Sequence, residues 1–216
     1  MPGRMMLRKP AARGPNASAV QADKKPRTKP AEIRRDELMD SGQSLFLSKG
    51  FGATSIEEIA QKAGVAKGTL YLYFKSKDDL LLSLQSRFVD NFCRKVEEAT
   101  RAPDAPWPSR LESFVTACVD TYLDDYALHD LVFHQYNPAD RRSKSDNSVT
   151  RLLEALLQEG KAEQAHRIDD VRLTAIMLFD ALHGAVDSEI HRGSRTDRKE
   201  LSKNVLSFYR NALNMA

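Results

Sequence analysis

The stretch from Phe46 to Leu80 constrains this chain more than any other feature. It reads FLSKGFGATSIEEIAQKAGVAKGTLYLYFKSKDDL. Its apolar side chains recur at i, i+3, i+4 and i+7, at positions Ile56, Ile59, Ala60 and Ala63. This spacing predicts a short amphipathic helix with one buried stripe.

The start and the end of that helix are both marked. Thr54-x-x-Glu57 and Ser55-x-x-Glu58 are each typical of a capping box, in which a hydroxyl and a carboxylate satisfy free amides of the first turn. Gly64 can adopt the left-handed conformation that a tight turn between two helices requires. We therefore expect a second short helix directly after this glycine.

The second helix is expected from about Ala66 to Phe74, with Leu70 and Phe74 as buried anchors. At ~100° per residue the opposite side presents small, polar and aromatic groups. Those outward residues are Lys67, Gly68, Thr69, Tyr71, Leu72 and Tyr73. Two helices joined by a glycine turn, the second with such a face, fit a helix-turn-helix that enters the major groove, but the geometry fits an ordinary helical hairpin equally well.

A family resemblance favours the helix-turn-helix. The residues that carry it are Phe46, Gly50, Phe51, Thr54, Ser55, Ile59, Ala60, Ala63, Gly64, Val65, Gly68, Thr69, Leu70, Tyr71, Tyr73, Phe74, Ser76, Lys77 and Leu80. Without a gap, this run resembles the amino-terminal signature of the TetR family of bacterial transcriptional regulators. The resemblance covers the DNA-reading part alone, and the rest of the chain carries no motif that we can match.

The resemblance implies a homodimer that reads an approximately palindromic double-stranded operator, and a small-molecule inducer that releases it. Residues implied at base edges or nearby sugar are Lys67, Gly68, Thr69, Tyr71 and Leu72, and those implied at phosphates are Tyr73, Lys77, Thr54 and Ser55. Glu57 and Glu58 stand where some relatives use a basic contact, which puts base reading by the first of the two helices in doubt.

Beyond this stretch, the chain shows only helical periodicities, so the expected fold is all-α with about nine helices. We divide the chain into a basic tail (1–30), a helix-turn-helix domain (31–80) and a helical ligand-binding and dimerisation domain (81–216). Expected helices outside the motif are Ala31 to Lys49, Ser76 to Thr100, Ser109 onward, Ala127 to Tyr136, Val149 to Gly160, Asp169 or Asp170 to His191, and Asp197 to Leu213. A polar segment from Asn137 to Ser148 is expected to be a loop.

Two further sites are expected in the ligand-binding domain. The inducer site should be lined by aromatic groups, although each of them also suits an ordinary core. These are Phe88, Phe92, Trp107, Phe114, Tyr122, Phe133, Tyr136, Phe179 and His183. A stripe of small side chains allows close approach of a partner helix or of a helix in the same subunit. The dimer interface is therefore expected at Ala181, Gly184, Ala185 and Ser188, with Leu206 and Tyr209.

Charge is distributed unevenly along the chain. The tail carries eight Lys and Arg residues against one Asp, a net charge of +7, whereas the whole chain carries +3. From Glu32 to Leu80 there are seven basic and eight acidic residues. Because such a head is poorly suited to approach a polyanion, we expect the tail to track phosphates or enter the minor groove. A solvated tail, or a true start at Met5 or Met6, is the alternative.

Composition and motifs exclude several other classes. No apolar run approaches the ~20 residues of a membrane span, and no signal-peptide core is present, so we expect a cytoplasmic protein. Cys93 and Cys118 suit buried hydrophobes better than a disulfide or metal site. His129 and His134 are spaced badly for a metal pair, and phosphate-binding or nucleophile motifs are missing, so neither a cofactor nor an enzyme is expected. The alternatives are an all-α carrier or enzyme, or a DNA-binding regulator without a ligand response.

Overall fold

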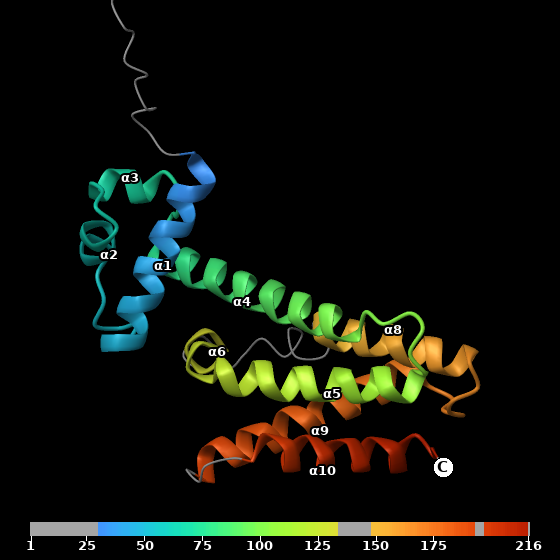
Figure 1. Ribbon diagram of the computed structural model, residues 1–216. Coiled ribbons are helices and arrows are strands. Elements are labelled where there is room, and N and C mark those ends of the chain that lie inside the picture. Colours follow the sequence, from blue (N-terminus) through green and yellow to red (C-terminus); the bar gives the residue numbers. More distant parts are fainter. Residues whose placement is uncertain (1–29, 134–147, 193–196, 216) are drawn as a thin grey trace, which may run out of the picture.

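The computed structural model describes residues 30–133, 148–192 and 197–215. Within these ranges the regular structure is helical, in nine helices, which confirms the all-α prediction. A small head of three helices stands at one end of the long helix α4 (Lys77–Thr100), and the remaining helices form a bundle at its other part, some against α4 itself and others beyond these (Figure 1). The basic tail and the segment 137–147 fall outside the described residues.

Helix α1 (Ala31–Lys49) has the bounds expected from sequence. It begins after Pro30 and ends at Gly50, whose φ of 90° turns the chain while its amide donates to the carbonyl of Phe46. Gly42 lies inside the helix because a Cβ there would come within 2.7 Å of the Leu80 side chain. The glycine thus lets α4 approach α1 closely, which offsets its poor helix propensity.

Helix α2 (Ile56–Lys62) is closed at both ends by local hydrogen bonds. Ser55 accepts from the amide of Glu58 while the Glu58 carboxylate accepts from the amide of Ser55, so this capping box forms as predicted. The box predicted for Thr54 does not form, because its buried hydroxyl donates to the carbonyl of Gly50 instead. At the other end, Gly64 has φ 68° and the amide of Val65 donates to the carbonyl of Ala60, a Schellman turn.

Helix α3 (Lys67–Tyr71) is shorter than the sequence predicted. It stops at the cap residue Leu72, so the predicted end at Phe74 was wrong. Phe74 still serves as an anchor, because it is 1% exposed and the Arg35 guanidinium lies 5.1 Å from its ring centre. A buried anchor therefore does not require a helical backbone here.

Helix α4 (Lys77–Thr100) joins the head to the rest of the molecule. Ser76 caps it by accepting from the amide of Asp79, as predicted. Its residue Arg87 reaches back to α1, where it donates to Asp40 (2.8 Å) and Gln43 (2.9 Å). Because α4 is continuous from the head into the second domain, a displacement at one end can be carried to the other.

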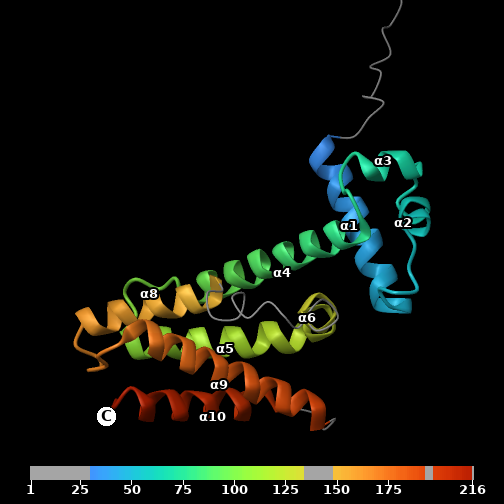
Figure 2. The same ribbon diagram turned by 180° about the vertical axis from the view of Figure 1, so that it is seen from behind.

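The second domain is a layered helical bundle. Its helices are α5 (Trp107–Asp124), α6 (Tyr126–Phe133), α8 (Ser148–Ala162), α9 (Val171–Arg192) and α10 (Arg198–Ala212). Helix α5 packs on α4, α8 packs on α9, and α10 covers α5 and α9 (Figure 2). Asp170 and Asp197 accept from first-turn amides of α9 and α10, so both were correctly predicted as caps.

Two predicted boundaries in this domain were wrong. Helix α5 begins at Trp107 rather than Ser109. Gly160 does not end α8, which continues to Ala162 and is closed by Gln164 at φ 59°. A Cβ on Gly160 would lie 2.3 Å from the Trp107 indole, so this glycine makes room for a tryptophan.

None of the helices described is long and apolar enough to cross a bilayer.

Candidate functional sites

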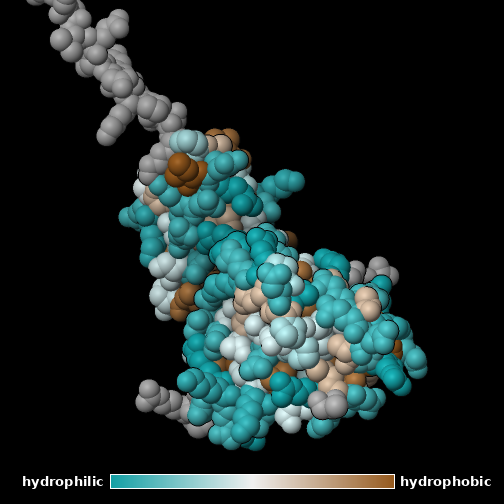
Figure 3. All heavy atoms as spheres, turned by 45° about the vertical axis from the view of Figure 1, so that its right-hand side comes forward, coloured by the Kyte–Doolittle hydropathy of each residue, from teal (hydrophilic) through white to brown (hydrophobic). Residues whose placement is uncertain are grey.

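The outer surface of the head is formed by α3 and the residues that follow it. Leu72 is 82% exposed and Tyr71 is 47% exposed, next to the open surface of Gly68. Figure 3 shows hydrophobic side chains at this outer end of an otherwise mostly hydrophilic head. Exposed apolar groups beside polar ones suit a surface that contacts bases and sugars.

One ion pair links α2 to α3 on this surface. The Lys67 ammonium donates to the Glu57 carboxylate, and the two side chains are 49% and 58% exposed. The same ammonium lies 5.8 Å from the ring centre of Tyr71. The hydrogen bond lowers the pKa of the Glu57 carboxyl and raises that of the Lys67 ammonium, so both groups are charged at neutral pH.

The residues predicted at phosphates are largely engaged within the protein. Thr54 is 2% exposed and closes the turn before α2, while Ser55 caps that helix. The Lys77 ammonium donates to the carbonyls of Phe51 (2.7 Å) and Thr54 (2.9 Å). A phosphate contact by these side chains would require such bonds to open or be shared, whereas Tyr73 is only partly buried.

A polar cluster lies inside the second domain, where α5, α6 and α9 meet. The Tyr122 hydroxyl donates to Asp187 (2.5 Å) and lies 3.1 Å from His129 Nδ1 and 3.3 Å from His183 Nε2. His183 Nδ1 lies 3.3 Å from Asp187 Oδ2. Burial raises the pKa of Tyr122, and Asp187 adds to this, so the phenol remains protonated. We call these four residues the Tyr–His–His–Asp cluster.

Aromatic rings surround this cluster on several sides. Phe88 lies 5.7 Å from His129 and 5.9 Å from Phe133 between ring centres, and Phe179 lies 5.9 Å from His183. Phe92 continues the row along α4, 6.1 Å from Phe88. Six predicted ligand residues thus gather here, namely Phe88, Phe92, Tyr122, Phe133, Phe179 and His183.

The other predicted ligand residues lie elsewhere. Trp107 is about 22 Å from Tyr122 along α5, and its indole donates to the carbonyl of Leu156 (2.7 Å). Phe114 is 1% exposed in the core of the bundle, and Tyr136 is outside the described residues. The sequence reasoning missed His129 and Asp187 as members of the site. The i,i+4 spacing of His183 and Asp187 was the signal available for the second.

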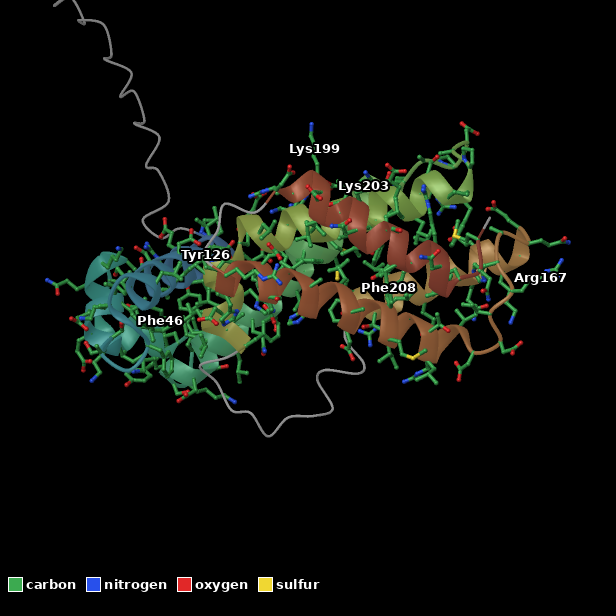
Figure 4. All side chains as sticks on the ribbon, turned by 90° about the horizontal axis from the view of Figure 1, so that it is seen from below. Phe46, Tyr126, Arg167, Lys199, Lys203 and Phe208 are labelled. Carbon is green, nitrogen blue, oxygen red and sulfur yellow. The ribbon has the colours of Figure 1, made fainter. Side chains whose placement is uncertain are left out.

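The predicted dimer residues divide into two groups. Ala181, Gly184, Ala185 and Ser188 lie at least partly open on α9, and a side chain at Gly184 would meet nothing within 4 Å. Exposed apolar residues extend this surface, at Leu173, Met177 and Phe208. Figure 4 shows Phe208 between α10 and α9, with Lys199 and Lys203 on the other side of α10.

The remaining predicted interface residues belong to the subunit core. Tyr209 is fully buried and its hydroxyl donates to the carbonyl of Leu178 (2.6 Å), while Leu206 is 7% exposed.

Both cysteines are free thiols, Cys118 buried and Cys93 partly so. Burial raises the pKa of both thiols, that of Cys93 to about 11. In the part of the chain that the structure describes, no group of three acidic, His or Cys side chains is arranged to hold a metal.

Two family models match this chain on either side of the end of α4. The model of bacterial regulatory proteins of the tetR family matches residues 38–84. A model of the tetracyclin repressor-like carboxyl-terminal domain matches residues 106–205. The first includes α2 and α3, and the second includes the Tyr–His–His–Asp cluster.

Relatives and solved structures agree with these matches. The chain is 35% identical over 162 residues to the transcriptional repressor KstR2 of Rhodococcus jostii, covering 71% of this chain and 78% of KstR2. It is 27% identical over 176 residues to a fatty acid metabolism regulator of Bacillus subtilis, covering 79% and 90%.

The structure of the fatty acid degradation regulator FadR from Bacillus halodurans superposes with a TM-score of 0.67 at 26% identity, covering 88% of this chain and all of that one. A FadR from Bacillus subtilis, solved with stearoyl-CoA, has the same fold, with a TM-score of 0.67 at 24% identity over 81% and 96% of the two chains.

The fold and the surface of the head define a helix-turn-helix DNA-binding regulator with a second, helical part. The chain belongs to the TetR family of bacterial regulatory proteins. It is accordingly a ligand-responsive transcriptional regulator that binds operator DNA as a dimer.

Proposed function

We propose that this regulator is a repressor whose effector is a long-chain acyl compound such as an acyl-CoA thioester. The observation that carries this proposal is the Tyr–His–His–Asp cluster within a row of aromatic rings along α4, α6 and α9. An acyl thioester has the complementary form, with a long apolar chain and a polar carbonyl at its end. Ligand sites in proteins commonly combine an apolar lining with a few polar groups that fix orientation.

Relatives support this choice of ligand class. The Bacillus subtilis regulator of fatty acid metabolism aligns with most of both chains, and the Bacillus halodurans protein shares the fold. In our proposal the chain of the effector separates Phe88, Phe133 and Phe179, and the cluster receives its polar end. Because Phe88 belongs to α4, its displacement would move the helix that carries the head.

On the DNA side, we propose that α3 lies in the major groove. Lys67, Thr69, Tyr71 and Leu72 would then contact base edges or sugar, with Gly68 allowing close approach to the backbone. Tyr73 and the turn at Ser55 would contact phosphates. We extend the dimer proposal to the open face of α9 and to Phe208, leaving out the buried Tyr209 and Leu206.

We also propose that residues 31–80 act as the DNA-reading unit and residues 81–216 as the ligand and dimer unit. In this proposal the regulator works in the cytoplasm and catalyses no reaction.

The effector proposal is tested by thermal unfolding of the full-length protein with stearoyl-CoA, stearate or CoA. Stearoyl-CoA should raise the melting temperature, since a ligand at 100 times its Kd stabilises the folded state by about 2.7 kcal/mol. Free CoA should not. The effect should weaken in Tyr122→Phe but remain in Tyr126→Phe, which removes an equivalent hydroxyl from an exposed position. Protein that binds DNA but responds to no acyl chain would refute the proposal.

A further inference from the structure

The head has an unusual charge balance around its reading helix. Lys67 is the single cation of α3, and Glu57, from the neighbouring helix, accepts a hydrogen bond from it. Both side chains are about half exposed on the outer surface. A carboxylate here opposes the approach of a polyanion, so the pair weakens general affinity for phosphate. Because Glu57 lowers general affinity for DNA, we expect this carboxylate to make a contribution to DNA recognition that offsets the loss.

The Lys67 ammonium is held from more than one side. Glu57 accepts from it, and the face of Tyr71 lies below it at 5.8 Å from the ring centre. Lysine alone is a flexible point charge that suits phosphate or base edges equally. These two contacts limit where the ammonium can lie, and its remaining donors point away from Glu57 and Tyr71. Glu57 meanwhile retains acceptor positions on its carboxylate.

We propose that Glu57 and Lys67 form one base-reading unit, and that its target is a G·C base pair in each half-site. The central groups of that pair in the major groove are guanine O6, an acceptor, and cytosine N4, a donor. These two atoms lie about 2.9 Å apart because they are themselves hydrogen-bonded. A hydrogen-bonded lysine and glutamate present a donor beside an acceptor at a similar spacing, and so complement them.

The same unit discriminates against a T·A pair. There thymine O4 and adenine N6 also present an acceptor beside a donor, and the unit could bridge them. The difference lies in the neighbouring group. Beside guanine O6 is N7, a second acceptor for the remaining ammonium protons, whereas beside thymine O4 is a methyl group. The unit therefore favours guanine under Lys67 and cytosine under Glu57.

The experiment is selection from a random duplex library with the full-length protein, so that no operator needs to be known. The wild type is compared with Glu57→Gln, with Lys67→Met and with the double variant. Asp40→Asn serves as a charge-matched control. Asp40 is an exposed acid paired with Arg87 on the side of α1 that faces α4. Its removal changes the charge of the head equally without touching α3.

Wild type should enrich one G·C pair per half-site at a position that Lys67→Met no longer specifies. Glu57→Gln and Asp40→Asn should both bind unrelated DNA more tightly. Of these two variants, Glu57→Gln alone should lose preference at that position, by about five- to a hundred-fold between the best and the worst pair. In the Lys67→Met background, Glu57→Gln should cause no further loss, because the unit is already broken.

Two outcomes would overturn the inference. If Glu57→Gln and Asp40→Asn give the same base preferences, Glu57 acts only by its charge. If the Lys67-dependent position selects T·A, the assignment of donor and acceptor is wrong. Failure of the DNA-binding function itself is distinguishable, since no variant would then enrich any sequence.

Discussion

The head and the ligand domain each hold an acid against a donor from a neighbouring helix, Lys67 for Glu57 and Tyr122 for Asp187, but at different depths. In the head, Glu57 and Lys67 are about half exposed to water. In the ligand domain, Asp187 and His183 are 29% and 33% exposed, and Tyr122, which contacts both, is 3% exposed. The two arrangements use similar chemistry in different dielectric surroundings.

This difference in exposure determines whether the polar groups contribute mainly to folding stability or mainly to ligand recognition. Water competes with an exposed ion pair, so such a pair contributes little to folding and remains available to a ligand. Water cannot reach a buried hydroxyl to replace a lost acceptor. Losing that acceptor therefore costs the full desolvation free energy of the hydroxyl. Exposed groups in the head are therefore suited to reading DNA, whereas the cluster ties α5, α6 and α9 together. In our proposal an effector competes for these contacts.

The largest effect is expected for Asp187→Ala. It removes the carboxylate acceptor of the buried Tyr122 hydroxyl and the partner of His183 Nδ1, and leaves the hydroxyl only the histidine nitrogens at 3.1 and 3.3 Å. The free energy of unfolding should therefore fall by about 3 kcal/mol. Asp180→Ala, on an exposed position of the same helix, should change it little. Urea denaturation measures both. If the two variants are equally stable, the cluster contributes no more to stability than a surface pair.

A smaller effect is expected for Gly184→Leu, which adds bulk to an open surface of the ligand domain. Nothing within the subunit lies within 4 Å of the added Cβ, so the subunit should fold normally. If the α9 face contacts a partner, dimerisation should weaken by about 1 to 3 kcal/mol, since overpacking commonly costs this much. Sedimentation across a concentration series measures it, with Gly184→Ala as the control. An unchanged dimer would place the interface elsewhere.

The smallest effect is expected on acidification. Burial lowers the pKa of His166, so the folded state resists its protonation. As the pH falls below about 6.5, the unfolded chain takes up a proton that the folded chain does not, and stability is lost. The Glu58 pKa is lowered to about 2, mainly by its hydrogen bond from Lys49, so its contribution is lost only as the pH falls from 4.5 towards 2. The ligand domain should therefore weaken before the head.

The single tryptophan of the chain reports this difference. Trp107 lies 5.2 Å from the His166 ring, and its fluorescence follows unfolding of the ligand domain. Between pH 7 and pH 5 the denaturation midpoint should fall less in His166→Gln, which keeps a donor for the carbonyl of Leu157. Equal slopes in the variant and the wild type would assign the loss to other groups.

Much of the fold was predictable because its signals are local. Pro30 and Gly50 bound α1, and Ser76 and Asp197 cap α4 and α10, in each case through atoms only a few residues apart. The all-α class was likewise predictable, since helical periodicity is visible in the sequence. The sequence did not predict which of the proposed ligand residues would lie together. Six of them gather at one cluster, whereas Trp107 lies at the opposite end of α5.

The sequence by itself determined where most helices begin and end, the turn at Gly64, and the family signature of the head. These depend on hydrogen bonds and backbone conformations within a few residues. Tertiary structure decided that Gly160 lies inside a helix against Trp107, that Tyr209 faces the core, and that Glu57 binds Lys67. Each depends on the distance between separate helices, which only their packing sets.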